Sequence, residues 1–227
     1  LRVKPTRRTL ERLALLGAFD SFGGKRRSDE AGEDPEVTRG DIIARVRQLN
    51  AIKNRPASEA NQPTLDFQVL EKLPTGNTEP TMAEKVSAEL SLMKLDVSEH
   101  VIELYRPMLE DMGVVNANEL VGLRNKSEVL IAGVRVATQT PPMRSGKRVV
   151  FISLDDGTGC SDSTFFDEAQ ARCSHILFNN RLLLISGKTR RTGVRGVSIM
   201  AENAWDLREM WDQWTKARPQ FRERAAG

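Results

Sequence analysis

The chain has 227 residues, and its 34 Lys and Arg against 31 Asp and Glu give a formal net charge of +3. Hydrophobic residues make up 39% and charged residues 29%, so we expect a water-soluble protein with one large core or two small ones. No window approaches the roughly 20 consecutive apolar residues of a membrane-spanning helix, and the start lacks a signal-peptide pattern. These features argue against membrane and secreted proteins, and the presence of only two cysteines makes the reducing cytoplasm the expected compartment. The first residue is Leu1 rather than Met, so we expect a piece of a longer protein.

The cysteines and histidines exclude most metal and redox sites. Only Cys160 and Cys173 are present, without a CxxC pair, so neither a disulfide framework nor a four-ligand zinc site is expected. His175 follows Cys173 by two residues, but packing or surface positions are favoured over a nucleophile pair. Signatures of P-loop, serine-hydrolase, zinc-protease and dinucleotide sites are absent. The sequence predicts no metal, no cofactor and no catalysis by this chain.

The N-terminal part of the chain is predicted to be helical. Apolar residues at helical spacing predict a helix over 6–16, with Gly17 as its C-terminal cap. A second helix is expected from Asp41 to just before Pro56. Further on, a proline-rich stretch predicts a linker.

A second helical region follows the linker. Thr81 and Glu84 have the spacing of a capping box, and the apolar stripe that follows, as far as Leu95, is expected to pack in a core. Another helix is expected over 98–106, where Pro107 should break the pattern.

From Val129 onward the periodicity is that of strands. We expect strands over 129–140, 148–155, 160–166, 181–186 and 195–200, with a helix over 167–177. Three strands, a helix and two strands within about 72 residues is the order of an OB-fold, a five-stranded Greek-key barrel. A last amphipathic helix is predicted in the tail that contains Trp205, Trp211 and Trp214. The fold class is α+β, with a helical part, a linker, a helical connector, an OB-fold and a C-terminal helix or tail at 1–55, 56–80, 81–127, 128–204 and 205–227.

The OB-fold prediction indicates where DNA would bind. Such barrels hold single strands across strands two and three, between the first-to-second and fourth-to-fifth loops. Both loops are basic here, and cations there can follow a phosphate backbone. Phe151 alternates with the apolar Val150 and Ile152, so its ring could stack on a base. The predicted DNA-binding residues are Phe151, Arg144, Lys147, Arg148, Lys188, Arg190, Arg191 and Arg195.

These residues also have a purely structural interpretation. Phe151 would then be a core residue, and the basic loops would be ordinary solvated hairpins. Charge reversal of Arg190 and Arg191 separates the two interpretations, because it should lower DNA affinity and flatten its salt dependence only in the first. Asp155 and Asp156 are expected to shape a turn rather than bind a metal, since no third acid lies at a telling spacing.

The linker contains a candidate peptide ligand in Gln62-Pro63-Thr64-Leu65-Asp66-Phe67. Leu65 and Phe67 have no nearby core, so they could fill pockets on a partner while the Gln62 amide fixes the register. The alternative is that the two apolar side chains anchor the linker to its own domain.

The run from Val129 to Phe166 resembles the OB domain near the C-terminus of bacterial C-family DNA polymerases, the alpha subunit of DNA polymerase III, and most closely the error-prone paralogue. The run from Leu10 to Gly24 is similar to the end of the family's tandem helix-hairpin-helix region, and 88–114 to the segment that connects it to the barrel. Lys94 stands where the family usually has Gly. Val101 stands where replicative members have Pro, which favours the error-prone subgroup.

The resemblance implies a template-holding OB domain and an internal peptide that binds the sliding clamp, whose pattern Gln62, Leu65 and Phe67 match. Other polymerase-complex subunits are further candidate partners. The catalytic palm of the family lies upstream of anything present in this chain, so nucleotidyl transfer is expected of the parent protein only. Three alternatives remain: an OB-fold module that binds only protein in a polymerase or repair complex, an enzyme whose metal or nucleotide site these motifs do not reveal and that would show turnover by the isolated chain, and an anticodon-binding domain of a tRNA synthetase.

Overall fold

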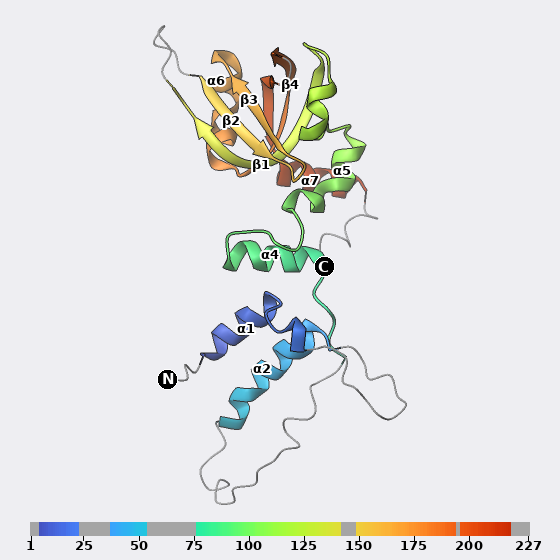
Figure 1. Cartoon of the computed structure of the whole chain (residues 1–227), viewed down its shortest axis with the longest axis vertical. Coiled ribbons are helices and arrows are strands. Elements are labelled where there is room, and N and C mark those ends of the chain that lie inside the picture. The colour runs from blue at the N-terminus through green and yellow to red at the C-terminus, as the bar shows by residue number, and fades with distance from the viewer. Residues whose placement is uncertain (1–4, 23–36, 54–75, 142–148, 194–195, 219–227) are drawn as a thin grey trace, which may run out of the picture. The chain divides into compact units, whose positions relative to one another are not determined.

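The computed structural model describes residues 5–22, 37–53, 76–141, 149–193 and 196–218 (Figure 1). The chain forms two compact units, residues 1–98 and 99–226. The first unit is helical, and the second holds a closed five-stranded barrel followed by a helix. The expected α+β class is thereby confirmed. None of the helices in the described ranges is long and apolar enough to cross a membrane.

The first unit contains the helices α1 (Arg7–Leu15), α2 (Arg39–Lys53) and α4 (Met82–Leu92) and the short 3-10 helix η1 (Asp20–Phe22). The hydroxyl of Thr6 caps the start of α1, and Gly17 follows its end with φ +78°, as the cap prediction requires. Helix α2 begins two residues before the expected Asp41. The predicted helices are confirmed.

Helix α4 begins with the predicted capping box. The Thr81 hydroxyl accepts a hydrogen bond from the Glu84 N–H, and the Glu84 carboxylate accepts one from the Thr81 N–H. Val86 is fully buried, but Met93 and Leu95 are 39% and 64% exposed. Core packing of the whole stripe is therefore wrong at its end, because the helix stops at Leu92 and the periodicity no longer applies.

The second unit begins with three short helices, η3 (Val101–Tyr105), α5 (Arg106–Asp111) and η4 (Ala117–Gly122). The helix expected over 98–106 is a 3-10 helix instead, and Pro107 does not end it. Pro107 lies in the first turn of α5, where its missing N–H costs nothing and its fixed φ suits the helix.

The strands are β1 (Glu128–Gln139), β2 (Val150–Asp155), β3 (Cys160–Phe165), β4 (Leu182–Thr192) and β5 (Gly196–Asp206). They close in the order β1-β2-β3-β5-β4, and only β3 and β5 run parallel. The predicted OB-fold is confirmed. Its interior is filled by fully buried apolar side chains from several strands, among them Ile152, Phe165, Leu183, Ile185 and Ile199.

Gly187 allows β4 and β5 to approach closely where their register shifts. A Cβ at this position would lie 2.3 Å from the carbonyl oxygen of Met200 and 2.9 Å from the Cα of Ala201. Both neighbours are backbone atoms, so only glycine fits this site in the ladder.

Two boundaries in the last part of the chain differ from expectation. The basic segment from Lys188 to Thr192 is part of β4 rather than a loop. Strand β5 continues to Asp206, so Trp205 belongs to the barrel and not to the terminal helix, whose start is capped by the Asp206 carboxylate.

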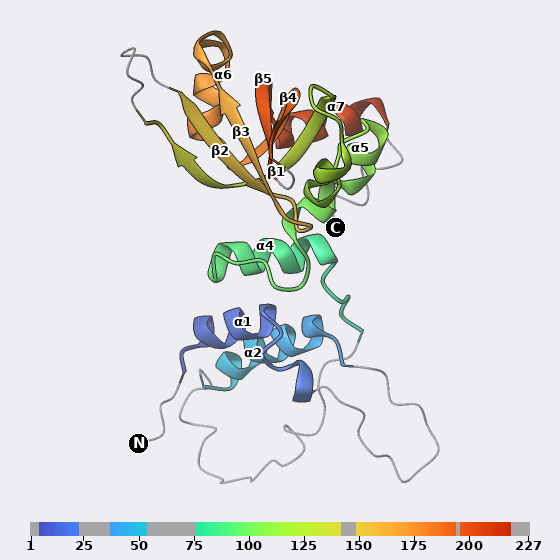
Figure 2. The same cartoon turned by 45° about the horizontal axis from the view of Figure 1, so that its top comes forward.

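Two helices cover different sides of the barrel (Figures 1 and 2). Helix α6 (Asp167–Asn179) connects β3 to β4 and buries Ala169, Cys173 and Leu177 against the barrel core. Helix α7 (Leu207–Ala217) lies beside α5, and its Trp211 ring meets that of Tyr105, the last residue of η3, edge to face at 5.4 Å.

Candidate nucleic-acid interface

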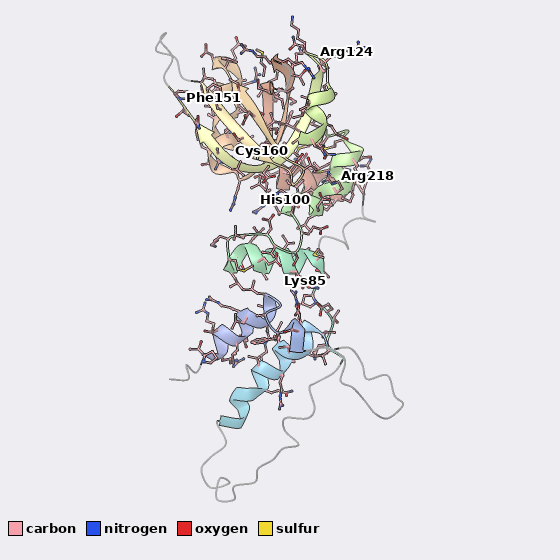
Figure 3. The ribbon with its side chains drawn as sticks, viewed as in Figure 1. Lys85, His100, Arg124, Phe151, Cys160 and Arg218 are labelled. Atoms are coloured by element: carbon pink, nitrogen blue, oxygen red, sulfur yellow. The ribbon has the colours of Figure 1, made fainter. Side chains whose placement is uncertain are left out.

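Side chains of β2 alternate between the interior and the outside of the barrel. Val150, Ile152 and Leu154 are fully buried, whereas Phe151 is 39% exposed. Figure 3 shows Phe151 on β2, away from His100 and Arg218. Because an exposed aromatic ring is available to a ligand, the core interpretation of Phe151 is wrong.

The strand register places Phe151 in a row with residues from three other strands. Phe151 lies opposite Thr164 on β3, Thr164 opposite Met200 on β5, and Met200 opposite Lys188 on β4. We call these four residues the outer row. Thr164 is only 9% exposed, and Met200 is 44% exposed. The row therefore presents two apolar side chains separated by a small one, with a cation at its end.

Met200 is the member of the row that sequence reasoning missed. Its neighbours Ile199 and Ala201 are buried, so alternation along β5 directs Met200 outward. The alternation is visible in the sequence, but the strand was expected to end at Met200, whereas β5 continues to Asp206.

Lys188 lies between two carboxylates. Its Nζ is 3.3 Å from Oε1 of Glu202 and 3.8 Å from Oε1 of Glu128, and its side chain is about half exposed. The predicted cation is thus present at the barrel surface, but it is partly neutralised by its neighbours.

Arg190 belongs to the neighbouring row. It lies opposite Ser198, which lies opposite Asp162, and the Asp162 carboxylate accepts a hydrogen bond from the Ser153 hydroxyl at 2.6 Å. Arg190 is exposed and forms no ion pair within the described ranges. Three of the predicted cations lie on β4, and Arg190 is the one whose charged group is available to a phosphate.

Arg191 is occupied by contacts within the unit. Its Nε donates to the carbonyl of Leu123 at 3.1 Å, its Nη2 donates to the carbonyl of Val121, and its backbone N–H donates to the Asn125 side chain at 3.1 Å. These contacts tie β4 to the end of η4 and to the segment after it, which gives Arg191 a structural role that its charge alone did not indicate.

The remaining predicted residues lie outside the described ranges. They are Arg144, Lys147, Arg148 and Arg195 for DNA and Gln62, Leu65 and Phe67 for the clamp.

The acidic turn between β2 and β3 is held by its own carboxylates. Asp155 accepts a hydrogen bond from the Gly157 N–H at 2.9 Å, and Asp156 accepts those of Thr158 and Gly159. Asp156 also accepts the Ala117 N–H at 2.7 Å, which joins the turn to η4. These bonds confirm that both acids shape the turn. Within the described residues, no group of three His, Cys, Asp or Glu side chains could hold a metal ion.

The thiols are poorly suited to nucleophilic chemistry. Burial, and next the nearby Asp155 carboxylate, raise the pKa of the Cys160 thiol, which keeps it protonated at neutral pH. Cys173 is buried in the barrel core, whereas His175 is exposed. The expectation that the latter two serve packing and surface is confirmed.

Comparison with known proteins gives one family and a set of relatives. Residues 129–207 match the tRNA_anti-codon family, described as OB-fold nucleic acid binding domain. The error-prone DNA polymerase of Symbiobacterium thermophilum is 32% identical over 178 residues, which cover 75% of this chain and 16% of that protein. The DNA polymerase III subunit alpha of Xylella fastidiosa is 24% identical over 232 residues, covering 91% and 18%. The predicted resemblance to these polymerases is confirmed.

The chain spans about a sixth of the length of the curated relatives that it matches, 16% for the protein of Symbiobacterium thermophilum. Among solved structures, the mitochondrial single-stranded DNA binding protein Rim1 of S. cerevisiae has a TM-score of 0.30 and 15% identity, covering 36% of this chain and 94% of that one.

Proposed function

We propose that this chain binds single-stranded DNA on the outer row of its OB barrel, as part of a longer DNA polymerase III alpha-type protein of the error-prone kind. The observation that carries the proposal is the register that aligns Phe151, Met200 and Lys188 across the barrel surface. Two exposed apolar side chains beside cations suit a strand whose bases stack on the protein while its phosphates face the charges.

The whole protein's activity is the second part of this proposal. Relatives over most of the chain are named error-prone DNA polymerase or DNA polymerase III subunit alpha. We infer that the barrel holds template strand near an active site that other parts of the polymerase supply. In this proposal the chain binds the template strand, and the whole protein carries out translesion DNA synthesis in the cytoplasm.

The direct test is fluorescence anisotropy of a labelled oligo-dT strand against this chain at low and at physiological salt, beside a duplex of equal length. We expect tighter binding of the single strand and a loss of affinity as salt rises. Phe151→Ala should weaken binding by about 5- to 150-fold, because stacking of one base on an aromatic ring contributes about 1–3 kcal/mol. The matched control is Phe178→Ala, which removes a ring that is 47% exposed on α6.

Three outcomes would contradict the proposal. No binding at low salt would favour the protein-interaction module, since nothing would then support a DNA role. Tighter binding of oligo-rU than of oligo-dT would favour the anticodon-binding alternative. Equal losses in Phe151→Ala and Phe178→Ala would remove the outer row from the interface.

The sliding clamp is proposed as a second partner on the sequence pattern alone. A double variant, Leu65→Ala with Phe67→Ala, should lose binding to a bacterial sliding clamp, because these two side chains would fill its pockets. The same variant should keep its affinity for oligo-dT. Unchanged clamp binding would assign the two residues to the chain's own domain instead.

A further inference from the structure

A groove of about 830 Å³ lies beside the outer row, between the β4–β5 ladder and the start of α6. Its lining includes Lys188 and Met200 from the outer row, and Phe166 and Arg172 from the other side. A volume of this size falls in the range of about 300–1,000 Å³ that holds small organic ligands in proteins. The groove is therefore large enough for part of a nucleotide chain.

Phe166 continues the outer surface of β3 into this groove. Phe165 lies opposite Ala201 and is fully buried, whereas Phe166 is 37% exposed. Phe166 comes two residues after Thr164, and two residues along a strand span about 6.6 Å on the same face. Phe151, across the ladder from Thr164, and Phe166, two residues further along the chain, are thus both neighbours of Thr164 on the outer surface.

The charge of the groove favours an anionic ligand. Its lining contains five cationic side chains, Lys126, Arg172, Lys188, Arg190 and Arg191, against the three acids Asp167, Glu168 and Glu202. Arg172 donates from Nη2 to the backbone carbonyl of Glu202 at 2.9 Å, which fixes its guanidinium at the edge of β5. A guanidinium has five N–H donors, so the others stay available for a phosphate.

We propose that a single strand bound on the outer row continues past Met200 into this groove, where Phe166 stacks on a base and Arg172 binds the adjoining phosphate. This inference rests on the proposed function. Its occupant is a segment of the same DNA strand, because the groove shares Met200 and Lys188 with the outer row. A free nucleotide would offer the same base and phosphate, so the experiment must distinguish a segment of the DNA strand from a free nucleotide.

The experiment compares oligo-dT strands of about 4 and about 16 nucleotides, the limits of site size for one OB-fold. The short strand can be held by the outer row alone, whereas the long strand also reaches the groove. Phe166→Ala and Arg172→Gln should each weaken the long strand by about 5- to 100-fold and leave the short strand unchanged. Phe151→Ala should weaken both.

Phe178→Ala is the matched control, because Phe178 is an exposed ring near the far end of the same helix, α6, about 18 Å from Phe166 at 1.5 Å per residue. The fold of each variant is verified by a thermal unfolding curve, followed by tryptophan fluorescence, that matches the curve of the wild type. The groove assignment would be overturned if wild type and Phe166→Ala bound the long strand equally, or if Phe166→Ala lost as much affinity for the short strand as for the long one. Phe151→Ala tests the outer row independently of these outcomes. Excess dTMP can compete for the groove alone. If it lowered the affinity of the wild type for the long strand to the value measured for Phe166→Ala, the groove would instead be assigned to a free nucleotide.

Discussion

Met200 of β5 lies directly opposite Lys188 of β4, so an exposed thioether and an ammonium group share one position of the ladder. The Nζ of Lys188 is held 3.3 Å from the carboxylate of Glu202, which is the next outward residue of β5. The barrel therefore carries an apolar and a cationic group side by side, and the Glu202 carboxylate partly neutralises the charge of Lys188. The strength of DNA binding should depend on that acid.

Glu202→Gln should raise the affinity for oligo-dT several-fold, because Lys188 would lose its nearer counterion and one carboxylate would no longer repel phosphate. The salt dependence should steepen by up to about 0.7 in the slope of log K against log salt, the value for one phosphate contact on a single strand. Anisotropy titrations across a salt series measure both. Glu110→Gln on α5 makes the same change in net charge at an exposed site, and an equal gain there would show that only overall charge matters.

Arg190→Gln should weaken oligo-dT binding and flatten its salt slope by about 0.7, since the exposed guanidinium would no longer neutralise a phosphate. Arg181→Gln is the control, because Arg181 is an exposed arginine just before the start of the same strand. Salt titrations of both variants decide the matter, and equal slopes would contradict the assignment. Arg191 is less informative, because its bonds to Leu123 and Val121 make a loss of affinity hard to separate from a loss of structure.

The order of strands and helix along the chain could be predicted, because the periodicity of the apolar residues indicates each element. Val150, Ile152 and Leu154 alternate with outward residues, and each proved to be fully buried. The capping box at Thr81 and Glu84 was equally predictable, because a cap depends only on residues within one turn. Local rules sufficed wherever the deciding contacts were local.

The basic segment of β4 could not be assigned in this way. Lys188, Arg190 and Arg191 resemble a solvated loop by composition, yet Thr189 between them is 2% exposed and donates to the carbonyl of Arg124. Pairing with β5 and contacts with the segment after η4 decide the strand, and Arg124 in that segment lies 65 residues before Thr189. The groove beside α6 was missed for the same reason, because Phe166 and Met200 meet only in three dimensions.

Lowering the pH should destabilise the first unit, partly through Glu89. Burial alone would raise the pKa of Glu89, but hydrogen bonds from Ser98 and from the Val97 N–H at 2.7 Å outweigh it and hold that pKa below its usual value. A lowered carboxylate pKa gives stability that is complete above the unfolded value of about 4.3 and is lost as pH falls through the folded value. Glu89→Gln should remove this pH dependence and lower stability at neutral pH.

The two units can be followed separately in that experiment. All three tryptophans lie after residue 200, so tryptophan fluorescence reports the second unit, while hydrogen exchange at the Val97 and Ser98 amides reports the Glu89 contacts. The protection factors of these amides, which correct for the slower intrinsic exchange in acid, should fall as Glu89 is protonated. If Glu89→Gln kept the pH profile of the wild type, the carboxylate would not be the group that titrates.

Lys94→Gly should stabilise the first unit by about 0.5–1 kcal/mol. Lys94 has φ +65°, in the left-handed region that costs an L-residue about 1–2 kcal/mol, and the greater chain entropy of glycine in the unfolded state offsets about half of the gain. Thermal unfolding followed by far-UV circular dichroism, with hydrogen exchange at the Met93 amide that closes α4, measures the change.

Lys94→Ala separates backbone strain from the side chain's own contact. The Lys94 ammonium donates to the carbonyl of Ser91 at 3.2 Å, and both variants lose this bond. Alanine keeps the Cβ that makes a left-handed backbone costly, so only glycine relieves the strain. We therefore expect Lys94→Ala to be no more stable than the wild type. Equal stabilisation by the two substitutions would mean that removal of a surface cation, and not the backbone conformation at the end of α4, is the cause.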